Sequence, residues 1–130
     1  MTTMQVNVKF RSWWLATGYL LIAAVVILSL IHIPRPLEMK APDKLNHLVA
    51  YAVLMYWWGM LQPSHRTRWL LFLPLLGLAL EGAQSAIPYR YFEWLDVVAN
   101  LSGVLLGWLL LQTPARRLMA SVNAYFSNAG

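Results

Sequence analysis

A group of side chains that could do chemistry lies between Glu81 and Asn100, in the stretch EGAQSAIPYRYFEWLDVVAN. It holds three of the five acidic residues of the chain, although apolar segments flank it on both sides. A carboxylate in an apolar setting is suited to general acid or base catalysis, and an arginine can bind a phosphate through two parallel hydrogen bonds. Glu81 is the central candidate for the first role and Arg90 for the second.

A second polar group precedes this stretch, at Asp43, Lys44 and His47. Asp43, His47 and Tyr51 are spaced i, i+4, i+8, which puts all three on one face of a helix. His47 could exchange protons with Glu81, and Lys44 could help to bind an anionic group. The chain has no cysteine and this polar set has one histidine, so we predict no metal site and no cofactor.

Four apolar segments must position these side chains. The chain has 130 residues, of which 59% are hydrophobic and 12% charged, whereas soluble domains average about 25% charged residues. A membrane-crossing helix needs about 20 apolar residues. We therefore predict an all-α integral membrane four-helix bundle over residues 13–111, with spans at about 13–33, 45–61, 69–87 and 95–111. Residues 1–12 would form a cytoplasmic N-terminal segment, and residues 112–130 a cytoplasmic C-terminal tail whose polar end, SVNAYFSNAG, is loosely ordered.

The distribution of charge predicts the orientation of this bundle. One side would hold six basic residues and no acid, and the other would hold four basic residues with all five acids on or near it. The six are Lys9, Arg11, Arg66, Arg68, Arg116 and Arg117, and the four are Arg35, Lys40, Lys44 and Arg90. The positive-inside rule then places both termini in the cytoplasm. Because the basic residues form no stripe, we predict no nucleic-acid partner.

The polar residues of three segments fall at a similar depth beneath the outer side. At 1.5 Å per residue, His47, Gln84 and Asn100 each lie roughly 6 Å inside their helix ends, and Glu81 about 10 Å inside. Ionisable groups at such depth should face the interior of the bundle or a water-filled cavity. We therefore predict a polar cup open to the outer side, formed by Asp43, His47, Glu81, Gln84, Arg90, Asp96 and Asn100.

Two further features concern how the helices begin and pack. Asp43 and Asp96 are each expected to open a helix as its N-cap. Gly103 and Gly107 continue the Asn100 face in a G-x-x-x-G pattern, which permits close approach of two helices. That approach could be within the chain or between two chains, so a homodimer through this face is one prediction.

The segments DKLNHLVAY and EGAQSAIPYRYFEWLDVVANLSGVLLG resemble the VanZ-like family of small bacterial membrane proteins. The resemblance covers residues 43–107 and rests on these positions: Asp43, Lys44, His47, Tyr51, Glu81, Gln84, Pro88, Arg90, Asp96, Asn100, Gly103 and Gly107. Tyr89 departs from the glycine common there in the family. The family is named after a protein linked to low-level resistance to the glycopeptide teicoplanin. The resemblance implies a multi-pass protein of the bacterial cytoplasmic (inner) membrane with a role in the cell envelope, but no particular reaction.

Three functions remain open at this point. In the leading one, the cup binds the anionic head group of an envelope lipid or lipid-linked precursor, with Arg90 and Lys44 as its cations and Asp43, Gln84, Asp96 and Asn100 as further binding residues. In the second, a membrane enzyme performs hydrolysis or group transfer on a lipid head group, with Glu81 and His47 as acid and base; no GxSxG or HExxH motif supports it. In the third, the polar residues only join the helices.

Overall fold

In the computed structural model, which describes residues 8–30, 40–86 and 91–129, four long helices cover the four apolar segments. They are α1 (Val8–Leu30), α2 (Lys40–Leu61), α3 (Arg66–Ser85) and α4 (Trp94–Leu110). The short 3-10 helix η2 (Pro63–His65) joins α2 to α3, and η3 (Pro114–Arg117) leads from α4 into a fifth helix, α5 (Leu118–Ala129). No strand occurs in the described residues, which confirms the all-α fold class.

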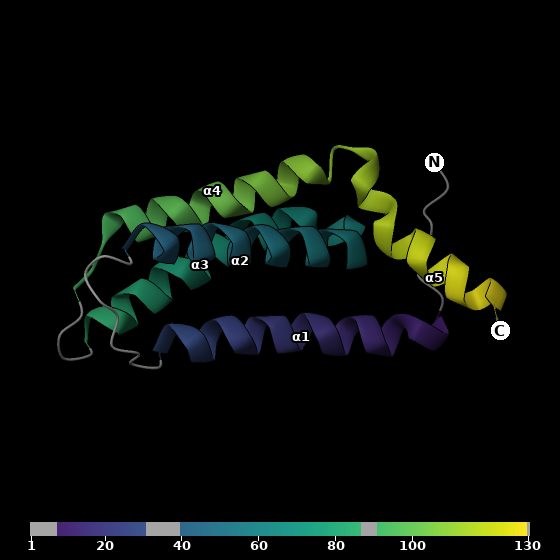
Figure 1. The fold of residues 1–130 in the computed structure, drawn as a ribbon, viewed down its shortest axis with the longest axis horizontal. Coiled ribbons are helices and arrows are strands. Elements are labelled where there is room, and N and C mark those ends of the chain that lie inside the picture. The colour runs from purple at the N-terminus through teal and green to yellow at the C-terminus, as the bar shows by residue number, and fades with distance from the viewer. Residues whose placement is uncertain (1–7, 31–39, 87–90, 130) are drawn as a thin grey trace.

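The four long helices run side by side in alternating directions (Figure 1). The start of α1, the end of α2, the start of α3 and the end of α4 lie at one end, together with α5. We call this the α5 end. The opposite end holds the starts of α2 and α4 and the ends of α1 and α3, and we call it the cup end. The alternation explains how polar residues from three different helices come to the same end.

The core lies between α2, α3 and α4, with α1 packed against α2 and α3. Trp58 is completely buried, and its ring stacks on that of Trp69 with the centroids 4.4 Å apart. A Cβ at Gly18 would lie 2.7 Å from the Trp58 ring, so the glycine lets α1 approach closely. Burying an aromatic ring of this size stabilises a fold by about 2–3 kcal/mol or more in water, so Trp58 anchors the core.

Gly103 and Gly107 allow α2 and α4 to pack in close contact. A Cβ at Gly107 would lie 2.6 Å from the Ala52 carbonyl oxygen, and one at Gly103 would clash with the Leu48 carbonyl oxygen. Of the two arrangements that the G-x-x-x-G pattern allows, the structure uses the one within the chain. A homodimer stays a prediction, and one through this face would have to displace α2.

The C-terminal region is helical, and the expectation of a loosely ordered tail was wrong. Met119 and Asn123 are spaced i, i+4 and are 3% and 6% exposed, so one face of α5 is buried. The Tyr56 hydroxyl also donates a hydrogen bond to the Ala115 carbonyl, at 2.5 Å, and fixes the start of this region to α2. The polar composition of the tail concealed this single buried face.

One helix among the described residues is long and apolar enough to cross a membrane by itself, at Phe10–Leu30. A second would arise if Trp94–Leu110 and Pro114–Phe126, which meet at an angle of 78°, were counted as one broken span. Large apolar side chains nevertheless stay exposed along the outward faces of α1, α3 and α4, for example Leu20, Leu71 and Leu105 at 69%, 64% and 53%. The four spans and the orientation of the termini stay predictions.

Candidate functional site

An ion-pair cluster joins α2 to the start of α4 at the cup end. The Lys44 ammonium lies 2.8 Å from Glu93 Oε2 and 3.0 Å from Asp96 Oδ1, and it donates a hydrogen bond to each. The Glu93 hydrogen bond raises the pKa of Lys44 above its ordinary value, more than burial lowers it. Asp96 is 6% exposed, whereas the side chains of Lys44 and Glu93 are 26% and 42% exposed. The cluster is therefore buried on the Asp96 side and open to solvent on the Glu93 side.

Glu81 lies beneath this cluster on α3. It is 2% exposed, and its Oε1 accepts a hydrogen bond of 2.9 Å from the backbone N–H of Glu93. Glu93 immediately precedes α4, so the Glu81 carboxylate holds the start of that helix against α3. A charged acceptor makes this a stronger bond than one between neutral groups. Glu81 also lies near Asp96 and His47.

His47 and Asn100 form the deeper contact of the site. His47 Nδ1 lies 2.9 Å from Asn100 Oδ1, which requires the Nδ1–H form of the imidazole for a hydrogen bond. Asn100 is 3% exposed, and Tyr51 is 2% exposed. A Cβ at Gly77 would lie 2.9 Å from Asn100 Nδ2 and 3.2 Å from the Tyr51 hydroxyl oxygen. The missing side chain at Gly77 therefore leaves room for these two polar groups between α2, α3 and α4.

Gln84 makes a separate contact, toward α1. Its Nε2 donates a hydrogen bond of 2.7 Å to the Ser29 backbone carbonyl, and the side chain is buried at 7% exposed. Ser29 lies in the last turn of α1, where helix carbonyls commonly accept hydrogen bonds from groups outside the helix. Gln84 thus attaches the end of α1 to α3 and does not contact the ion-pair cluster through this bond.

The structure brings Lys44, His47, Glu81, Asp96 and Asn100 together at the cup end. Gln84 lies at the same end, on the α1 side of α3. The side chain of Asp43 and the whole of Arg90 are outside the described residues, so their predicted positions in the cup stay predictions. The binding and catalytic roles assigned from the sequence also stay predictions.

The expected N-caps were wrong in position. The helix α2 begins at Lys40, so Asp43 is within its first turn, and α4 begins at Trp94 with Glu93 as its N-cap residue. Asp96 is therefore also within a first turn, where its carboxylate binds Lys44 instead of capping backbone N–H groups. An acid in the first turn still interacts favourably with the helix dipole, which explains why both positions tolerate a carboxylate.

Sequence reasoning missed two residues of the site, Glu93 and Gly77. Glu93 is the hub of the cluster, since its carboxylate binds Lys44 and its backbone N–H binds Glu81. Its position three residues before Asp96 in a polar stretch was an available signal. Gly77 is four residues before Glu81, which places both on one face of α3, and that spacing could have identified it.

The described charges of the site are three carboxylates, at Glu81, Glu93 and Asp96, and one ammonium, at Lys44. This set can accept hydrogen bonds and bind cations more readily than anions. Lys44 uses two of its three N–H donors on the carboxylates, which leaves one for another acceptor. Within the described residues, no three His, Asp or Glu side chains are grouped so that they could hold a metal ion.

A family model described as VanZ/LLP1 matches residues 4–115 of the chain. The chain belongs to the VanZ/LLP1 family. No curated protein and no solved structure matches it. The match extends the resemblance beyond residues 43–107 to include α1, the start of α2 and the end of α4, so the whole of the four long helices is VanZ/LLP1 sequence. Membership supports a membrane-associated protein of the cell envelope, in keeping with the apolar α1.

Proposed function

We propose that this VanZ/LLP1 protein crosses the bacterial inner membrane four times and binds the head group of an envelope lipid at its cup end. The observation that carries the proposal is the partly exposed cluster of Lys44, Glu93 and Asp96 at one end of helices whose sides are apolar. A lipid beside the protein would have its acyl chains against those sides and its head group at the level of the cluster.

The exposed apolar residues support the membrane placement. Soluble monomers seldom expose continuous apolar patches larger than a few hundred Å², and here Leu71, Leu75 and Leu78 on α3 are 64%, 64% and 43% exposed at helical spacing. Basic residues gather at the opposite end from the cup. Arg66 and Arg116 lie near each other there, and burial together with the Arg116 charge lowers the pKa of Arg66. The positive-inside rule then directs the α5 end to the cytoplasm and the cup outward.

The described carboxylates favour hydrogen-bond donors and cationic groups on the ligand, so an anionic head group needs Arg90 as its main cation. A head-group phosphate would be bound mainly by Arg90, which the sequence places in the loop between α3 and α4, with the remaining Lys44 N–H as a second donor. Hydroxyl or ammonium groups of the same head group would meet the Glu93 carboxylate, which is the most exposed acid of the cluster. The ligand class is thus an anionic phospholipid or a lipid-linked envelope precursor that also carries hydrogen-bond donors.

A lipid-dependent thermal shift tests this assignment. Protein in a neutral detergent is titrated with phosphatidylglycerol, and with phosphatidylcholine as the reference lipid. At ten times the dissociation constant, a ligand stabilises the folded state by about 1.4 kcal/mol, which corresponds to a rise in Tm of roughly 3–6 °C. Arg90→Ala should lose most of this rise and keep the lipid-free Tm, whereas Arg68→Ala, an exposed arginine at the α5 end, should behave like wild type. An equal rise in Arg90→Ala would contradict the proposal.

Cysteine labelling tests the orientation separately, because the chain has no cysteine of its own. Ser64 in η2 and Ser85 at the end of α3 are both exposed and lie at opposite ends. In intact cells, a membrane-impermeant maleimide should label Ser85→Cys and not Ser64→Cys, while both should react after the membrane is disrupted. Labelling of Ser64→Cys alone in intact cells would show that the orientation is the opposite of the proposed one.

A structural role for the polar residues is the second candidate, and a specific observation favours it. Glu81, Gln84 and Asn100 each have a partner in another segment of the chain, namely the Glu93 N–H, the Ser29 carbonyl and His47. If this is their only role, Arg90→Ala and wild type will respond equally to every lipid, and substitution of the buried residues will lower Tm without affecting lipid binding.

A further inference from the structure

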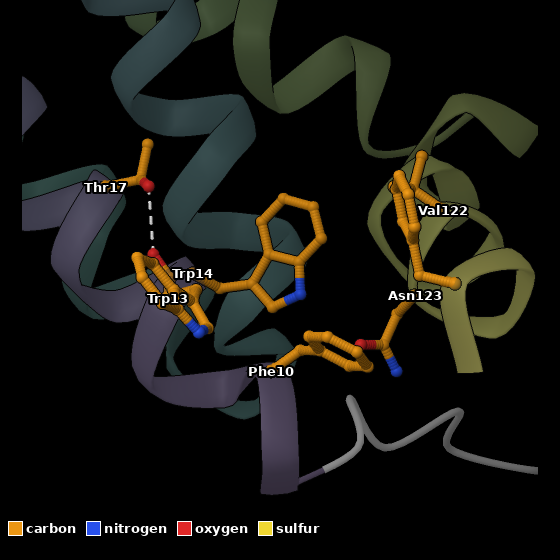
Figure 2. A pocket seen from close by; sticks show the side chains of 7 residues that line it. Phe10, Trp13, Trp14, Thr17, Val122 and Asn123 are labelled. Carbon is orange, nitrogen blue, oxygen red and sulfur yellow. Dashed lines mark hydrogen bonds between the residues drawn. The ribbon is translucent and has the colours of Figure 1, made fainter. Parts of the chain in front are cut away.

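A groove between α1 and α5 lies at the opposite end of the molecule from the cup (Figures 1 and 2). Phe10, Trp13 and Trp14 line it from α1, and Val122, Asn123 and Phe126 line it from α5. Its volume is about 140 Å³, which is close to that of engineered apolar cavities, of about 150 Å³, that bind benzene. The groove is therefore large enough for a small head group or a short length of acyl chain.

Two buried polar atoms beside this groove have no hydrogen-bond partner. They are Nε1 of Trp14 and Oδ1 of Asn123, and the whole Asn123 side chain is only 6% exposed. Figure 2 shows the nitrogen-bearing edge of the Trp14 indole turned toward α5, and the Asn123 amide turned toward α1. A buried polar group without a partner costs about 1–3 kcal/mol, so a ligand hydroxyl that reached these two atoms from the groove would recover part of that cost.

The chemistry of the two atoms restricts what that ligand can be. An indole N–H only donates, and an amide oxygen only accepts. A hydroxyl does both, so hydroxyl groups satisfy the two atoms together. The seven described side chains that line the groove include no charged group, so nothing there would offset the charge of a phosphate. The hydroxyl of the remaining lining residue, Thr17, already donates to the Trp13 carbonyl at 2.9 Å.

The position of the groove determines the rest of the ligand. Trp13 and Trp14 lie at the start of α1, the one described helix that is long and apolar enough to cross a membrane by itself, and Trp13 is 73% exposed, as expected for the aromatic belt at a membrane surface. A molecule that reaches this depth with an apolar part and a neutral hydroxyl is a lipid. We propose that the α1–α5 groove binds a neutral acylglycerol, whose free glycerol hydroxyl takes the Trp14 N–H and the Asn123 oxygen while an acyl chain lies along Phe10 and Phe126.

This site is distinct from the cup and uses neither its residues nor its ligand class. It shares with the proposed function only the placement in a membrane. Binding at the two sites can therefore be lost independently: Arg90→Ala should remove the response to phosphatidylglycerol and keep acylglycerol binding, and substitutions in the groove should do the reverse.

Native mass spectrometry tests the proposal. The protein is prepared in lauryldimethylamine oxide, a detergent without hydroxyl groups, and titrated with 1,2-dioctanoylglycerol or with trioctanoylglycerol, which has no free hydroxyl. We expect one dioctanoylglycerol per chain, and binding of trioctanoylglycerol at least about fivefold weaker, because it lacks the hydroxyl and so loses at least one of that group's two hydrogen bonds. Glycerol alone should not displace the bound lipid, because it lacks the acyl chain.

Two substitutions remove the polar atoms one at a time. Asn123→Leu and Trp14→Phe should each weaken dioctanoylglycerol binding about fivefold, while Asn128→Leu, the same change at an exposed position of α5, should leave it unchanged. Asn123→Leu removes a buried atom that has no partner, so its Tm should be equal to that of wild type or higher. Equal binding of the two glycerides, complete displacement by glycerol, or unchanged binding in Asn123→Leu would each overturn the proposal.

Discussion

Replacing Gly107 by alanine should separate α2 from α4 and destabilise the protein. The added Cβ would lie 2.6 Å from the Ala52 carbonyl oxygen and 2.8 Å from Met55 Cβ, and the first of these is a backbone atom that cannot rotate away. Overpacking of a close contact destabilises a protein by about 1–3 kcal/mol. A shift of the helices by about 0.5–1 Å would also forfeit a quarter to a half of the dispersion energy of the side chains between them.

The higher helix propensity of alanine opposes this loss of stability. The propensity effect can be measured separately in the same protein. Alanine is favoured over glycine by about 1 kcal/mol inside a helix. Gly82 on α3 provides the control, because a Cβ there would meet nothing within 4 Å. Gly82→Ala should therefore keep or raise the Tm, while Gly107→Ala should lower it by roughly 3–10 °C for a net loss of about 1–2 kcal/mol.

Thermal unfolding in detergent, followed by far-ultraviolet circular dichroism, compares the two variants directly. Gly103→Ala, whose Cβ would clash with the Leu48 carbonyl oxygen, should lower the Tm as Gly107→Ala does. A Gly107→Ala protein as stable as Gly82→Ala would refute the close packing of α2 on α4, and with it the positions of the polar residues that these two helices carry.

Three more substitutions test the cup end by the same assay. Lys44→Met should cost about 1–3 kcal/mol, because it leaves the buried Asp96 carboxylate without its cation while Lys44 itself is partly exposed; an unchanged Tm would mean that the pair is not formed. Glu81→Gln keeps an acceptor for the Glu93 N–H and should cost less than about 1 kcal/mol, whereas Glu81→Leu should cost about 2–3 kcal/mol; equal losses would exclude that hydrogen bond. Gln84→Leu should cost about 1 kcal/mol and make the end of α1 more sensitive to limited proteolysis, and no change in cleavage would contradict its attachment to the α1 carbonyl.

The helices and the register of their polar faces could be predicted from the sequence, because both depend on local periodicity. The apolar segments predicted the four long helices to within a few residues, and the rise of 1.5 Å per residue predicted a similar depth for His47 and Asn100, which contact each other at 2.9 Å. Asp43 and Asp96 were assigned as N-caps on residue type alone. The structure starts α2 three residues before Asp43 and α4 two residues before Asp96, because the choice of cap depends on the path of the preceding loop.

The pairing of side chains could not be predicted, since it depends on how the helices are rotated against one another. The packing of α2 on α4 places Lys44 between Glu93 and Asp96, a pairing that the sequence did not indicate, and the binding role of Lys44 stays a prediction. The approach of α1 gives Gln84 a carbonyl partner that was also not foreseen, and its predicted place in the cup stays a prediction. The burial of α5 was missed for the same reason, because the surface that covers Met119 and Asn123 comes from other parts of the chain.

The most direct test of head-group binding at the cup end is to identify the lipids that stay with the protein. Wild type, Arg90→Ala and the matched Arg68→Ala are each reconstituted with a total lipid extract of bacterial envelopes, purified again, and analysed by mass spectrometry for bound and free lipids. The account predicts that wild type and Arg68→Ala retain the same anionic lipid, unchanged in mass, and that Arg90→Ala loses it while keeping its Tm. Equal lipid contents in all three proteins would contradict it, and a lipid of altered mass in the wild-type sample alone would show an enzyme instead.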